Sequence, residues 1–144
     1  MRSNHKAFVA ILSATIWISI SEFVRNELLL KSYWLDHYGE LGIVFPSGLV
    51  NGAIWGLWSL VFAIFIYFLS RKFSLIGISL LAWFAGFPLM WIVMWNLDVL
   101  PIKLIPFAVP LSLLEAFLAV CIIGKISPLP SNEGLFIFPL FMKT

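Results

Sequence analysis

The sequence predicts an all-α integral membrane protein in which four transmembrane helices form a small bundle. Of its 144 residues, 62% are hydrophobic and 11% are charged, whereas soluble domains carry roughly 25% charged residues. The mean hydropathy is +1.04, and a soluble fold of this size has no core large enough for 14 Phe and 7 Trp. The net charge of +2 is small and the basic residues form no stripe, so nucleic acid is not an expected partner. The partner that the composition implies is the lipid bilayer.

Four apolar segments are long enough to cross a membrane. About 20 residues are needed to span about 30 Å of hydrocarbon as a helix, and the segments cover residues 7–30, 48–69, 74–97 and 104–124. Helices are expected because lipid offers no partner to unpaired backbone groups, and because the segments lack the alternation of barrel strands. The chain 1–144 is therefore a single membrane domain. Its tail, residues 125–144, is too short to span and is expected to lie on the membrane surface.

The connections between these spans differ in character. Residues 31–47 mix aromatic and charged side chains, which suits the headgroup level, and they include the expected loop Tyr33–Tyr38. Arg71 and Lys72 form a tight turn, so spans two and three make an antiparallel hairpin. Residues 96–103 form the third connection.

The distribution of basic residues predicts the orientation in the membrane. Six of them fall on one side, namely Arg2, Lys6, Arg71, Lys72, Lys125 and Lys143, and three on the other, namely Arg25, Lys31 and Lys103. Because cytoplasmic loops carry the excess of Lys and Arg, both termini are expected in the cytoplasm of a multi-pass protein of the cell (inner) membrane. A cleaved signal peptide ending near Ser21 is the alternative. Trp17 and the continuous run into residues 22–30 favour a retained helix.

A stripe of small residues opens the second span. Gly48, Gly52, Gly56 and Ser59 recur at steps of four, four and three, a spacing that lets another helix backbone approach closely. The stripe is expected to pack against a helix, either within the bundle or in a homo-oligomer or membrane complex. The competing interpretation is a chance pattern in a glycine-bearing membrane helix.

Glu115 is the first candidate for a functional residue. It lies eleven residues into the fourth span, which is about 16 Å along a helix axis and near the bilayer centre. Ser112 precedes it by one turn on the same face. A carboxylate at that depth is costly unless it is paired, hydrated or protonated. It is expected either to bind a proton or substrate, or to join helices as a neutral hydrogen-bonding group.

A second group of polar residues lies towards the non-cytoplasmic side. Glu22, Arg25 and Asn26 are spaced by three and four residues, so a local ion pair can form. Asn51 and Asn96 are expected at a similar depth, and together these residues would line a polar cavity. A neutralised pair at the end of a helix is the equally simple alternative.

The function that these features favour is binding or transport of a proton, or of a small, partly apolar solute, through a polar bundle interior. One alternative is a non-catalytic assembly or partner subunit of a membrane complex, which would dock through the glycine stripe and the Tyr33–Tyr38 loop. A second alternative is an intramembrane enzyme acting on a lipid or quinone through Glu22, Glu115 and a neighbouring Asn. No nucleophile–base pair is evident, so a non-enzyme is favoured. No metal or cofactor is expected, because one Cys and two separated His make no ligand pattern.

Overall fold

The computed structural model describes residues 2–128, and it confirms the four-helix membrane fold. Four helices are long and apolar enough to cross a bilayer, at Asn4–Leu29, Leu49–Leu69, Leu75–Asn96 and Ile102–Ile126. All regular structure within the described residues is helical. The expected surface-lying tail falls almost entirely at residues 129–144, outside the described residues.

The first span continues into a helix in a region where the sequence predicts only a connection. Helix α1 (Arg2–Phe23) runs into a π-helical segment, η1 (Val24–Leu29), and then into α2 (Lys31–Glu40). The segment Tyr33–Tyr38 is therefore part of a helix, and its interpretation as a loop was wrong. Trp34 is the reason: it is buried and anchors α2 in a small core with Leu100 and Leu104, near the start of the last span.

The third span is bent where a glycine, a phenylalanine and a proline follow one another. Helix α3 (Leu49–Leu69) is joined by the predicted tight turn to α4 (Leu75–Gly86), and α5 (Pro88–Asn96) follows directly. Proline lacks the amide hydrogen that would continue the helix, so α4 and α5 form one bent span. A short 3₁₀ turn, η2 (Ile102–Leu104), leads into α6 (Ile105–Ile126).

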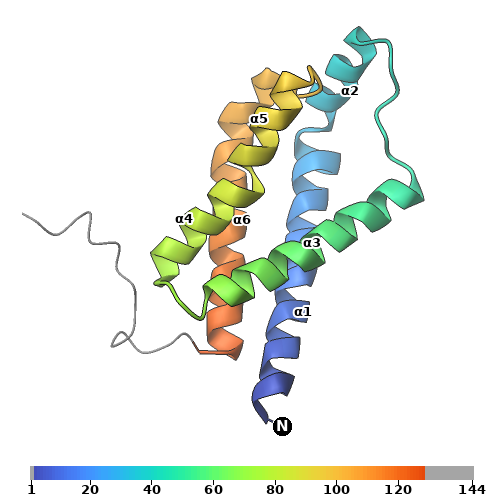
Figure 1. Cartoon of the computed structure of the whole chain (residues 1–144). Helices are drawn as coiled ribbons and strands as arrows, with labels where there is room; N and C mark the ends of the chain where they lie inside the picture. The colour runs from blue at the N-terminus through green and yellow to red at the C-terminus, as the bar shows by residue number, and fades with distance from the viewer. Residues whose placement is uncertain (1, 129–144) are drawn as a thin grey trace, which may run out of the picture.

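Helices α1 and α6 lie side by side and run in opposite directions, as Figure 1 shows. Helix α4 packs on α6, and α3 crosses α1 with its N-terminal half leaning away from the bundle (Figure 1). Small side chains allow these close contacts, because Ala10 and Ala14 of α1 and Ala119 of α6 are completely buried. The main core gathers around them at the end of the molecule where α1 begins.

The middle of the glycine stripe does not pack closely against another helix within residues 2–128. A methyl group built on Gly52 or Gly56 would meet no atom within 4 Å, because this half of α3 leans away from α1. Of the stripe, Ser59 alone is buried, and its hydroxyl donates to the carbonyl of Trp55 at 2.9 Å. The close approach occurs instead at Gly86, where an added methyl would lie 2.7 Å from the Phe62 ring. Packing of the stripe against another chain stays a prediction.

Candidate functional site

Arg25 lies between two buried carboxylates from different spans. Its guanidinium donates through Nη2 to Oε1 of Glu22, one turn earlier, and through Nη1 to Oε2 of Glu115 in α6 at 3.0 Å. The exposed fractions are 5% for Arg25, 4% for Glu22 and 0% for Glu115. Cζ of Arg25 also lies 4.9 Å from the centre of the Phe87 ring, a cation–π contact. The structure thus joins the two candidate groups that the sequence placed in separate spans.

The π-helical segment gives Arg25 its position. In η1 the amide of Leu30 donates to the carbonyl of Arg25, five residues back, at 2.9 Å. The wider turn changes which side chains face the bundle, and Arg25 is the one residue of η1 that is buried. Single π turns inside α-helices occur frequently at functional sites. No signal in the sequence separates this segment from an ordinary amphipathic turn.

Further hydrogen bonds fix both carboxylates. Ser21 donates to Oε2 of Glu115 at 2.8 Å, and the Trp17 indole donates to the Glu115 carbonyl at 3.1 Å. On the other side, Asn26 donates to Oε2 of Glu22 at 2.7 Å. The contacts of Ser21 and Trp17 join α1 to α6 at the depth of Glu115, whereas the contact of Asn26 lies within the first span.

The cluster contains one more acid than base. With both carboxyls ionised, Glu22, Arg25 and Glu115 carry a net charge of −1 inside the membrane, which is costly. Oε1 of Glu115 is buried and has no hydrogen-bond partner among the described residues. A buried polar atom without a partner calls for a proton, an ion or a ligand. With both carboxyls ionised, the cluster therefore lacks one positive charge for neutrality.

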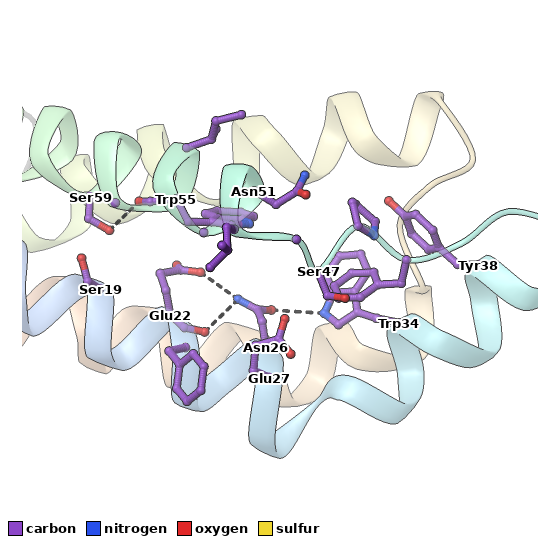
Figure 2. A pocket seen from close by; sticks show the side chains of 18 of the residues that line it. Ser19, Glu22, Asn26, Glu27, Trp34, Tyr38, Ser47, Asn51, Trp55 and Ser59 are labelled. Atoms are coloured by element: carbon purple, nitrogen blue, oxygen red, sulfur yellow. Dashed lines mark hydrogen bonds between the residues drawn. The ribbon is translucent and has the colours of Figure 1, made fainter.

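A cavity of about 700 Å³ lies next to this cluster, between α1, α2 and the leaning half of α3. Glu22 and Asn26 form part of its wall, and Asn51, Gly52 and Trp55 of α3 lie opposite. Figure 2 shows Glu22 pointing from α1 towards α3, while Asn26 connects it to the Trp34 indole, which donates to Oδ1 of Asn26 at 3.2 Å. The open glycine stripe is thus a wall of the cavity.

The candidates from the sequence divide into those that line the cavity and those that do not. Glu22, Asn26 and Asn51 line it together with Gly48, Gly52, Gly56 and Ser59. Arg25 and Glu115 lie behind Glu22, outside the cavity lining: Arg25 contacts Glu22, and Glu115 contacts Arg25. Ser112 accepts a hydrogen bond from the Trp83 indole at 2.9 Å, and Asn96 is exposed at the end of α5; neither lines the cavity.

The sequence does not predict the aromatic walls of the cavity as a group, although the depth of Trp55 in the second span suits either a cavity wall or core packing. Trp34, Tyr38, Phe45 and Trp55 line the cavity, and they come from α2, the following loop and α3. Aromatic residues are common throughout this chain, so no pattern in the sequence distinguishes these four. Within residues 2–128, no group of three or more His, Cys, Asp or Glu side chains is placed to hold a metal ion.

Comparison of the chain with protein-family models, curated proteins and solved structures gave no match. The function must therefore be argued from the site itself.

Proposed function

We propose that this protein binds a small, partly apolar solute in the cavity beside Glu22, as the binding step of a transport or sensing function at the membrane. The observation that carries the proposal is the cavity itself. Its volume of about 700 Å³ falls in the range of roughly 300–1,000 Å³ that is typical of small-molecule sites. Its walls are mostly apolar, and a few polar groups, Glu22, Asn26 and Asn51, lie on two facing helices.

The packed core closes the cavity towards the end of the bundle where α1 begins. The lining of the cavity extends along α1 to Ser19 and along α3 to Ser59. Beyond these residues the two helices enter the main core, in which Ala14, Ile18 and Ala63 have no exposed surface. A solute bound in this conformation therefore has no path through the core towards the end of the bundle where α1 begins, as a binding protein or one state of a carrier requires.

The charge cluster behind the cavity supports a proton as the coupled species. Arg25 contacts both carboxylates, so a change of charge at either one alters its interaction with the other. Such a link between a solute site and a buried carboxyl is what coupling between the solute and a proton needs.

We place the protein in the cell (inner) membrane with both termini in the cytoplasm. The start of α1, the turn between α3 and α4, and the end of α6 lie towards the same end of the bundle (Figure 1). These segments carry Lys6, Lys72 and Lys125. Arg25 is paired inside the buried cluster, so among residues 2–128 the basic side chains towards the opposite end are Lys31 and Lys103. This increases the asymmetry on which the orientation depends. The cavity then opens to the non-cytoplasmic side.

The proposal is tested by filling the cavity. Gly52→Phe places a ring in the open space above Gly52, and Leu57→Phe is the matched control, because Leu57 is 61% exposed on α3 and does not line the cavity. The probe is 2-phenylethanol, a small solute with one apolar and one polar end. A bound ligand raises the melting temperature, and at a fixed ligand concentration the rise is larger for a ligand of higher affinity. The parent and Leu57→Phe proteins are expected to show this rise in detergent, and Gly52→Phe is expected to lose it.

An unchanged response in Gly52→Phe would overturn the cavity as the solute site. The alternative function as a partner subunit would be favoured by two results together: no variant responds to the probe, and Leu57→Phe no longer assembles with another protein of the membrane. In that case the exposed side of α3 would be a contact with another protein.

A further inference from the structure

We propose that the cavity selects organic cations: solutes with an ammonium group that lies against Glu22 and an apolar or aromatic body that fills the remaining space. This inference rests on the proposed function and specifies its ligand class. Among residues 2–128, two carboxylates line the cavity, Glu22 and Glu27, and no basic side chain does. Glu27 is already neutralised by Lys31, whose Nζ lies 2.7 Å from its Oε2. The charge that acts on a bound solute is therefore that of Glu22 and the cluster behind it.

The aromatic walls suit the same class of ligand. Phe45 stacks on Trp34 with ring centres 5.8 Å apart, and Tyr38 meets Phe45 edge to face at 5.4 Å. Trp55 contributes a further ring from α3. Aromatic faces attract cations, most strongly where water is excluded. An anionic solute would meet these rings and a carboxylate with no cationic group on the cavity wall.

The charge balance of the cluster favours one added cation. Arg25 cannot neutralise Glu22 and Glu115 at the same time, and α3 and α5 present only uncharged residues to the cavity, such as Asn51 and Met94. When both carboxyls are ionised, an ammonium group at Glu22 brings the net charge from −1 to zero. When one carboxyl holds a proton, the ammonium group takes the place of that proton in the charge balance. It also leaves the guanidinium of Arg25 free to pair fully with Glu115.

This arrangement gives Glu115 a measurable effect on a cavity that it does not touch. In Glu115→Gln, Arg25 neutralises Glu22 alone, so the cluster starts at zero charge and a bound cation brings it to +1. The affinity for a cation is therefore expected to fall, although no wall of the cavity has changed. A merely structural role of Glu115 would affect charged and uncharged ligands alike.

The experiment compares two probes of nearly equal shape. At neutral pH, 2-phenylethylamine carries an ammonium group where 2-phenylethanol carries a hydroxyl. Their dissociation constants are measured by calorimetry with the full-length protein in detergent. The amine is expected to bind about tenfold more tightly than the alcohol to the parent protein. Glu22→Gln is expected to remove most of that preference. Glu115→Gln, which changes no residue of the cavity wall, is expected to do the same while leaving the affinity for the alcohol nearly unchanged. Glu40→Gln is the control, because Glu40 is exposed on α2 and does not line the cavity; it is expected to keep the full preference.

Equal binding of the two probes by the parent protein would overturn the cation inference and leave the proposed function intact. Binding of neither probe would remove both. A preference that Glu115→Gln retains in full, in a protein that melts as the parent does, would show that Arg25 does not link the two carboxylates.

Discussion

Replacing Arg25 by glutamine is expected to cost far more stability than replacing any exposed base. The substitution leaves two carboxyls, 4% and 0% exposed, without their shared cation. Removing one partner of a buried ion pair costs about 3–5 kcal/mol, a large share of the roughly 5–15 kcal/mol by which folded proteins are stable. The partly exposed pair Glu27–Lys31, with side chains 27% and 42% exposed, provides the comparison, because ion pairs in contact with solvent contribute about 0–1 kcal/mol.

The assay is unfolding of each variant in detergent with increasing SDS, followed by far-ultraviolet circular dichroism. Arg25→Gln is expected to unfold at a clearly lower SDS fraction than the parent, and Lys31→Gln at nearly the same fraction. The double variant Arg25→Gln with Glu115→Gln is expected to be more stable than Arg25→Gln alone, since it removes one of the two unpaired acids. Equal losses for Arg25→Gln and Lys31→Gln would refute the argument that a buried charge cluster holds α1 to α6.

Two further outcomes test the packing and the orientation. Gly86→Ala is expected to lower the free energy of unfolding by about 1–3 kcal/mol, because its methyl would lie 2.7 Å from the buried Phe62 ring. Gly52→Ala meets open space and is expected to change stability by less than about 1 kcal/mol, in the stabilising direction; the reverse order in a melting experiment would contradict the helix arrangement. For orientation, a cysteine replacing Asp36 is expected to react with an impermeant thiol reagent in intact cells, in a chain whose native cysteine has been removed. A cysteine replacing Lys72 is expected to resist the reagent, and labelling of Lys72→Cys alone would invert the topology.

The sequence predicts the spans well, because the length of an apolar run and the cost of unpaired backbone in lipid leave little choice. It also marks Glu22, Arg25, Asn26 and Glu115 as candidate site residues, since charged and strongly polar side chains are rare in such helices and each requires a partner. The pairing of Arg25 with Glu115 could not be predicted from the sequence. These residues are ninety positions apart, and their contact depends on how α1 packs against α6 and on the π turn.

The glycine stripe is a case in which a clear sequence pattern does not determine the packing. A regular spacing of small residues permits a close helix contact but does not require one. Gly52 and Gly56 lie on the half of α3 that leans away from α1, so the absence of side chains there forms a wall of the cavity. The close contact occurs at Gly86, which follows Ser79 and Ala82 at steps of three and four on the small-residue face of the third span. Which glycine meets a neighbour is decided by the tilt of whole helices, and local spacing carries no information about that tilt.

The most direct test is the chemical accessibility of a cysteine at Asn51, measured in liposomes with and without 2-phenylethylamine. Asn51 lines the cavity, so in a chain without its native cysteine, Asn51→Cys is expected to react with a water-soluble maleimide from one side of the membrane. The amine is expected to slow that reaction in a saturable manner, whereas Leu57→Cys, on the exposed face of α3, is expected to be unreactive in lipid. An Asn51→Cys protein that does not react, or that reacts at the same rate at every amine concentration, would contradict a solute-binding cavity open to water.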